Sequence, residues 1–220
     1  GWVSPATEYL KSNNAPFKVS ANEISWIAWA FFVTEVIFSA LQGLFMRSFG
    51  RKPILIFSAF IQTLGWLVLI LANSTTTIIL GRLLLGASAG SYDVIWCMYI
   101  GEVTTPLERG VFGSFFISLF LGGIMAQFFL SLWLPYVYLS IVPFAISATT
   151  LVMEFFIKES PYYLLQSGKL EAAKRNLTWL RGNDDPEIVQ AEFNEIRKYV
   201  EEEATSKNYV WSHAHPAESL

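Results

Sequence analysis

The chain has 220 residues, of which 53% are hydrophobic and only 15% are charged, with a formal net charge of −3. A soluble domain usually carries roughly a quarter charged residues, so the composition argues against a soluble globule. The small negative net charge gives no sign of a nucleic-acid-binding surface. Only ten Asp, Glu, Lys or Arg residues occur from Ser25 to Ile157. This distribution predicts a membrane core with polar ends, so the first expected partner is the lipid bilayer.

Residues 1–24 precede the first long apolar stretch and are expected to form an extracellular or lumenal segment. Because residue 1 is Gly rather than Met, we expect the chain to begin inside a longer or processed product. Residues 25–157 then contain five apolar windows that reach the roughly 20 residues needed to cross a bilayer as a helix. These windows are Ser25–Phe49, Pro53–Ala72, Ile78–Ile100, Gly110–Leu134 and Tyr136–Ile157. The sequence therefore predicts an all-α, polytopic membrane protein.

The distribution of Lys and Arg predicts the orientation of these helices. One set of connections carries all the basic residues, whereas the opposite connections, 73–77 and 134–136, carry none. The basic connections hold Arg47, Arg51, Lys52, Arg109 and Lys158. We therefore expect the N-terminus outside, the C-terminus in the cytoplasm and, by default, a location in the plasma membrane.

Residues 158–203 are predicted to form a cytoplasmic helical domain, with one helix after Pro161 and another that starts near Pro186 and ends near Glu203. Residues 204–220 show no periodicity and are expected to be disordered. Two histidines in this tail, His213 and His215, lack the further ligands that a zinc site needs, so no metal or other cofactor is expected. The single cysteine, Cys97, is expected to be a small buried side chain.

Charged residues inside membrane spans are costly, and each one is a functional hypothesis. Glu35 lies near the middle of the first span, and Arg82 and Asp93 lie three turns apart on one face of the third. Glu35 or Asp93 could face a cavity and bind substrate or a proton. Alternatively, one of them forms a structural ion pair with Arg82. Pairs of small residues, Gly86 with Gly90 and Gly122 with Gly123, are expected to support close helix packing.

Several motifs occur in the order typical of one transporter family. They are "GWVSP" at the start, Gly43-x-x-x-Arg47-x-x-Gly50-Arg51-Lys52, Gly81-Arg82, Tyr99-x-x-Glu102-x-x-x-Pro106-x-x-Arg109-Gly110, and Glu159-Ser160-Pro161 followed by "YYLLQSGKLEAA". Over residues 1–182 the chain resembles the sugar porters of the major facilitator superfamily, in particular the insect trehalose-transporter-like members. The resemblance implies a fold of twelve helices in two halves. This chain corresponds to helices two to six, so the remaining half is an expected partner.

The resemblance also implies site residues. Arg51, Glu102, Arg109 and Glu159 match a cytoplasmic network of charges that latches the two halves of the transporter together. Where the family typically has Asp, this chain has Arg47, which would weaken that latch. Glucose transporters commonly place a sugar-binding Gln at the position of Ile117, and Gln127 on the same span could substitute for it.

These observations predict transport of a small polar solute, a hexose or a disaccharide, by alternating access. The alternative is a non-transporting sugar sensor or membrane interaction protein with a degenerate site, which Arg47 and Ile117 favour. A membrane enzyme would need a cluster of a nucleophile and a base, or of metal ligands, inside a span. We find none in the sequence and expect no enzymatic activity.

Overall fold

The computed structural model describes residues 2–11, 19–182 and 185–214, and these residues form nine α-helices and no strand. The side chains of a few residues inside the helices, Arg47 among them, are not described. The chain divides into two compact units, Gly1–Ile157 and Lys158–Leu220. Each unit is described by itself.

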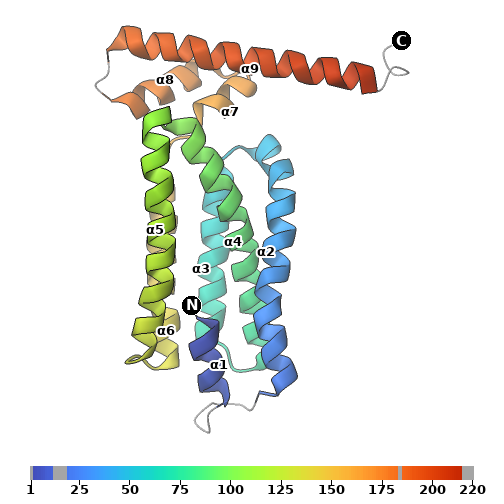
Figure 1. Cartoon of the computed structure of the whole chain (residues 1–220), viewed down its shortest axis with the longest axis vertical. Helices are drawn as coiled ribbons and strands as arrows, with labels where there is room; N and C mark the ends of the chain where they lie inside the picture. Colours follow the sequence, from blue (N-terminus) through green and yellow to red (C-terminus); the bar gives the residue numbers. More distant parts are fainter. Residues whose placement is uncertain (1, 12–18, 183–184, 215–220) are drawn as a thin grey trace. The chain divides into compact units, whose positions relative to one another are not determined.

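Five long helices dominate the first unit (Figure 1). They are α2 (Ala21–Phe49), α3 (Lys52–Ile70), α4 (Thr75–Val103), α5 (Pro106–Ser131) and α6 (Tyr136–Glu154). Each contains a segment long and apolar enough to cross a membrane, which confirms the predicted all-α polytopic fold. Two helical segments were not predicted within residues 1–24: the short helix α1 (Val3–Lys11) and the first turn of α2.

Local sequence determines where these helices begin and end. Ser20 and Glu23 form a reciprocal capping box at the start of α2, and Thr105 and Glu108 form another at the start of α5. Such boxes satisfy backbone N–H groups that have no partner within the helix. Gly50 ends α2 with a φ of 88°, a conformation that a residue with a Cβ rarely adopts. The chain therefore turns sharply between α2 and α3.

Helix α4 lies between α2 and α3, and glycines permit both contacts (Figure 1). A Cβ on Gly86 would lie 2.1 Å from the carbonyl oxygen of Phe31 in α2. On the α3 side, a Cβ on Gly81 would lie 3.2 Å from the carbonyl oxygen of Gly65. The predicted packing role of Gly86 and Gly90 is thus confirmed, since the backbones of α2 and α4 approach too closely for side chains at these positions.

Helix α1 packs at the end of the bundle where α2 and α4 begin. Its buried side chains are Ala6 and Leu10, and the preceding residue, Trp2, is also buried. The Trp2 indole nitrogen donates a hydrogen bond of 3.0 Å to the hydroxyl of Ser140 in α6. The surrounding apolar cluster includes Ile27, Leu69, Ile78, Leu85 and Leu139. We call this the α1 end of the bundle and the other, where α2 ends and α3 begins, the basic end.

Two sequence expectations about buried positions are wrong. The first concerns helix α5, which has few contacts with the rest of the first unit. No described atom lies within 4 Å of a Cβ built on Gly122 or Gly123, so this pair makes no close packing contact. Cys97 is exposed rather than buried. It lies on α4 away from the buried face that carries Ile95 and Tyr99.

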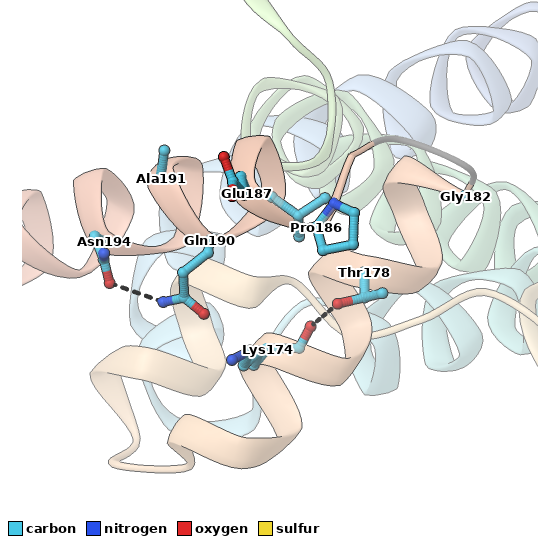
Figure 2. A pocket seen from close by; sticks show the side chains of 9 residues that line it. Lys174, Thr178, Gly182, Pro186, Glu187, Gln190, Ala191 and Asn194 are labelled. Atoms are coloured by element: carbon cyan, nitrogen blue, oxygen red, sulfur yellow. Dashed lines mark hydrogen bonds between the residues drawn. The ribbon is translucent and has the colours of Figure 1, made fainter.

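The second unit contains α7 (Pro161–Gln166), α8 (Leu170–Arg181) and α9 (Pro186–Ala214). Their shared core is Leu164, Leu165, Ala173, Leu177, Val189, Phe193, Ile196 and Val200. An open pocket separates parts of α8 and α9, with Lys174 and Thr178 on one side and Gln190 and Asn194 on the other (Figure 2). Helix α9 was expected to end near Glu203 but extends to Ala214, so residues 204–214 continue a helix. His215 and the remaining tail residues lie outside the described part of the chain, as does the side chain of His213.

Candidate functional site

The basic end of the first unit is held by a bidentate ion pair between Arg51 and Glu102. The Arg51 guanidinium donates from Nη2 to Oε1 over 2.6 Å and from Nε to Oε2 over 3.0 Å. Arg51 also donates to the carbonyl oxygen of Met46 over 3.4 Å. Its side chain is only 6% exposed and that of Glu102 is 14% exposed. Charge-assisted, two-point hydrogen bonds of this kind are strong and directional, so the start of α3 is fixed to the end of α4.

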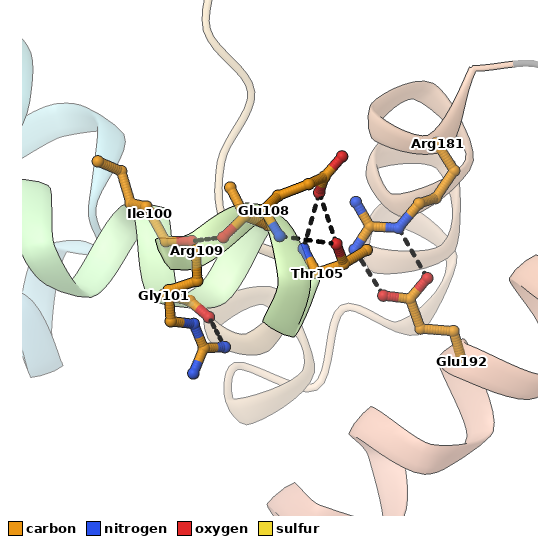
Figure 3. Close-up of polar contacts among 8 residues, drawn as sticks. Ile100, Gly101, Thr105, Glu108, Arg109, Arg181 and Glu192 are labelled. Carbon is orange, nitrogen blue, oxygen red and sulfur yellow. Dashed lines mark hydrogen bonds and ion pairs between the residues drawn. The ribbon is translucent and has the colours of Figure 1, made fainter. Parts of the chain in front are cut away.

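Arg109, in the first turn of α5, contacts the same region through the backbone. Its Nη2 donates to the carbonyl oxygen of Gly101 over 2.6 Å (Figure 3). This carbonyl lies in the last turn of α4, where carbonyl oxygens lack helical partners and the helix dipole favours a cation. Among the described residues, no ion pair joins Arg109 to Glu102. The structure thus places three of the four predicted network residues in two separate contacts: Arg51 with Glu102, and Arg109 with a backbone carbonyl.

The fourth predicted network residue, Glu159, belongs to the second unit. Its carboxylate accepts a hydrogen bond of 3.0 Å from the backbone N–H of Ser160, just before α7. Its carbonyl oxygen accepts one of 2.9 Å from the amide of Asn176 in α8. Glu159 therefore fixes the turn that leads into the helical unit.

Arg82 is buried inside the bundle, with an exposed fraction of 6%. Its Nε donates to the carbonyl oxygen of Ile27 in α2 over 3.2 Å. The guanidinium carbon lies 4.5 Å from the ring centre of Phe31 and 5.9 Å from that of Trp2. Cation–π contacts of this length compensate part of the loss of water around a buried cation. Arg82 thus ties α4 to α2 and to the segment before α1.

The two membrane carboxylates, Glu35 and Asp93, lie along the contact between α2 and α4. Glu35 is half-buried, and its carbonyl oxygen lies against Gly90. Asp93 is exposed and follows Gly90 by three residues on α4. Within the described part of the chain, no ion pair connects Arg82 to either carboxylate. The alternative of a direct structural pair with Arg82 therefore gains no support from the geometry.

The two candidate sugar-binding positions on α5 have different surroundings. Gln127 donates from its amide nitrogen to the carbonyl oxygen of Leu139 in α6 over 2.9 Å, so this group links two helices. Ile117 is 59% exposed and offers no hydrogen-bonding group. The position of Ile117 itself therefore cannot form a side-chain hydrogen bond with a sugar.

Sequence reasoning missed a buried polar contact between α4 and α6. The Tyr92 hydroxyl donates to Oε1 of Glu154 over 2.7 Å, and Glu154 is only 2% exposed. The second carboxyl oxygen, Oε2, has no hydrogen-bond partner among the described residues. Nearby, the Lys52 ammonium donates to the carbonyl oxygen of Phe155, directly after α6, over 2.8 Å. Glu154 was visible in the sequence as an acid at the end of an apolar window, but nothing there indicated its partner.

The described residues contain no group of three or more His, Cys, Asp or Glu that could hold a metal ion. The polar groups of the first unit that lie between helices are ion pairs, capping contacts and single hydrogen bonds. Within the part of this unit that the structure describes, they include no adjacent nucleophile and base, such as acyl or phosphoryl transfer requires. This arrangement can hold helices in register and release them, which suits a protein that changes conformation.

Comparisons with known proteins agree with this description. The model of the family described as "Sugar (and other) transporter" matches residues 3–216. The chain is 27% identical over 198 residues to the facilitated trehalose transporter Tret1 of Apis mellifera ligustica, a match that covers 90% of this chain and 39% of that protein. It is 26% identical over 201 residues to a putative sugar transporter, ERD6-like 13, of Arabidopsis thaliana, which covers 91% of this chain and 40% of the relative. The chain thus spans about two fifths of the length of these relatives.

Solved structures show the same fold. A structure of the xylose transporter XylE from E. coli, in a partially occluded inward-open conformation, superposes with a TM-score of 0.77 at 19% identity. The match covers 91% of this chain and 55% of that one. Another, of the proton:xylose symporter XylE bound to a bromo-deoxy-glucose, has a TM-score of 0.78 and covers 97% of this chain and 52% of the other.

Proposed function

Because the chain belongs to the sugar (and other) transporter family, we propose that it forms part of a carrier that moves a small polar solute across a membrane by alternating access. The chain is a multi-pass membrane protein, and its family and structural neighbours are transporters, which points away from an enzyme. The names of the relatives, trehalose and sugar transporters, support a hexose or disaccharide as the solute.

The observation that carries this proposal is the pair of Arg51 and Glu102. Two charges that are almost excluded from water and joined by two hydrogen bonds form one defined geometry, so the contact is either made or broken. Such a contact at the end of a bundle suits a gate that alternates between two states. We assign Arg109 and Glu159 to the same gate because they match the charge network of the family. The charge of Arg47 would weaken the gate by repelling Arg51.

We further propose that the basic end of the bundle faces the cytoplasm and that the carrier lies in the plasma membrane. The excess of Lys and Arg at this end supports the orientation. The second unit then lies on the cytoplasmic side, and the α1 end of the bundle lies outside.

For substrate or proton binding we propose Asp93 and Glu35. Asp93 is exposed although it lies within a membrane-spanning helix, which suits a residue that lines a water-filled path. Glu35 lies on the neighbouring helix α2, where its backbone meets Gly90, three residues before Asp93 on α4. Arg82 supports this site by fixing α4 against α2, and Gln127 supports it by fixing α5 against α6.

Uptake of radiolabelled glucose and trehalose in transport-deficient cells tests this function. The 220-residue chain and the longest product of its gene are compared, with surface expression measured for both. We expect uptake by the longer product. Arg51→Lys should lower its maximal rate about tenfold with little change in KM, because it breaks the gate but not the binding site. Asp93→Asn should instead change the KM. No uptake by either form at the membrane would contradict transport of these two sugars.

A second function, a sugar sensor that does not transport, is favoured by Ile117. Recognition of sugar hydroxyls depends on hydrogen bonds, and Ile117 provides none, while the Gln127 amide already bonds to α6. Sugar binding without uptake, measured by protection of the purified protein against heat, would support the sensor. If Ile117→Gln instead gained uptake of glucose or trehalose, the original protein would be better explained as a carrier of a different solute.

A further inference from the structure

The second unit has an uneven distribution of charge. Residues 158–182, which include α7 and α8, hold five Lys or Arg against two Glu. Residues 185–203, at the start of α9 and along it, hold seven Asp or Glu against two basic residues. The segment with α7 and α8 therefore carries a net positive charge, and the first part of α9 carries a net negative charge.

The basic residues gather around an exposed tryptophan on α8. Trp179 is 58% exposed, and the Lys158 ammonium lies 5.5 Å from the centre of its ring. Lys174 and Arg175 are exposed on the same helix and line a shallow hollow with Trp179. The hollow also contains Thr178 and one acid, Glu171. We call Lys158, Lys174, Arg175 and Trp179 the α8 patch.

The α8 patch is tethered close to the membrane by the chain itself. Lys158 follows Glu154, the last residue of the membrane-spanning helix α6, by four residues. Four residues extend at most roughly 14 Å, and the headgroup layer adds about 6 Å beyond the hydrocarbon on each side. Since Lys158 contacts Trp179 directly, the patch cannot lie far from the headgroups.

We propose that the α8 patch binds the anionic headgroups of a phospholipid bilayer. Basic side chains next to a membrane span are attracted to anionic lipids, and tryptophan has an amphipathic ring that favours the membrane–water boundary. The acidic α9 is repelled by the same surface, so the unit binds in one orientation. This proposal requires only that the chain is inserted in a membrane. It does not depend on whether the protein transports a solute or on which side of the membrane the second unit lies.

The test uses the complete chain reconstituted in vesicles, with a nitroxide label at one introduced cysteine. Cys97 is the only native cysteine, so Cys97→Ser provides the background. Thr178→Cys places the label at the centre of the α8 patch. Ala191→Cys places it on an exposed position of α9, between Glu187 and Glu195. Collisions of each label with a water-soluble nickel reagent are measured in vesicles of phosphatidylcholine alone and with phosphatidylserine added.

We expect phosphatidylserine to protect the label at position 178 but not the label at position 191, and salt to reverse this protection. The charge-reversed variant Lys174→Glu/Arg175→Glu should lose it, because each basic residue contributes about fivefold to the ratio of bound to unbound unit. Arg197→Glu/Lys198→Glu is the matched control. It changes the net charge equally, but on α9, where both residues form exposed ion pairs.

Three outcomes would overturn the proposal. The first is equal protection of position 178 in neutral and anionic vesicles. The second is an equal effect of the two charge-reversed variants, which would indicate a response to net charge alone. The third is protection by inorganic phosphate in neutral vesicles, which would assign the patch to a soluble anion. Because both leaflets of these vesicles have the same composition, the result does not depend on the proposed sidedness, and a failure of sugar uptake would leave it unchanged.

Discussion

The carbonyl oxygen of Glu35 lies 2.1 Å from the position that a Cβ on Gly90 would occupy. The backbones of α2 and α4 therefore touch at this point, and no side chain fits between them. The same holds one helical turn earlier, at Gly86 and Phe31. The contact between these two helices depends on residues that have no side chain.

We predict that Gly90→Ala destabilises the first unit by about 3 kcal/mol or more, because the methyl group forces two backbones apart. Gly122→Ala is the matched control, since nothing described lies within 4 Å of its Cβ. It should be neutral or stabilise by up to about 1 kcal/mol through helix propensity. Thermal unfolding in detergent, followed by circular dichroism, measures both. Equal stabilities of the two variants would contradict this account of the contact.

The pair of Arg51 and Glu102 predicts strong coupling between two substitutions. Arg51→Gln or Glu102→Gln alone should each cost about 3–5 kcal/mol, since each leaves a buried charge without its partner. The double variant should cost clearly less than the sum. The free energy of unfolding of all four proteins gives this comparison, and additive effects would show that the pair contributes no direct interaction.

The hydrogen bond between Tyr92 and Glu154 predicts that losing one partner is destabilising, whereas replacing both partners by apolar side chains restores stability. Tyr92→Phe should destabilise by about 2 kcal/mol, because it removes the only described hydrogen-bond partner of a buried carboxyl group. Tyr92→Phe with Glu154→Met removes both polar groups and should return to within about 1 kcal/mol of the original stability. A double variant less stable than Tyr92→Phe would mean that Glu154 has another essential partner.

In the second unit, Arg181 and Glu192 link α8 to α9 through bonds of 2.8 Å and 2.5 Å (Figure 3). The side chains are 10% and 28% exposed. Glu192→Gln should raise the rate of amide hydrogen exchange in both helices by about tenfold, because it weakens a largely buried ion pair. Glu201→Gln should change it little, since the pair of Arg197 and Glu201 is exposed and local to one helix. Similar effects of the two variants would contradict a link between α8 and α9.

The sequence was sufficient to predict the membrane helices, because each needs about 20 apolar residues and the connections are short and polar. It could not show which side of each helix is buried. Apolar residues lie on all sides of each membrane helix. The periodicity that marks the buried face of a soluble helix is therefore absent. Cys97 was misplaced for this reason, whereas Gly86 and Gly90 were placed correctly because glycine pairs do indicate a face.

The candidate site was predictable where a motif was present. Arg51 and Glu102 were expected at one gate from the family motifs, and the structure joins them directly. The joint role of the four gate residues remains a prediction. Tyr92 and Glu154 lie 62 positions apart, and no motif covers the pair. A contact between two helices depends on their relative rotation, which a single sequence does not specify.

The bond between Trp2 and Ser140 also bears on how the first unit is made. The two residues are 138 positions apart, so at about 5–20 residues per second the partner of Trp2 is synthesised roughly 7–28 s after it. Until then the indole and the neighbouring α1 have no complete binding surface, because Leu139 in their apolar cluster also belongs to α6. Trp2 therefore reaches its final place only after α6 has been made, and closing the α1 end of the bundle follows the synthesis of all five long helices.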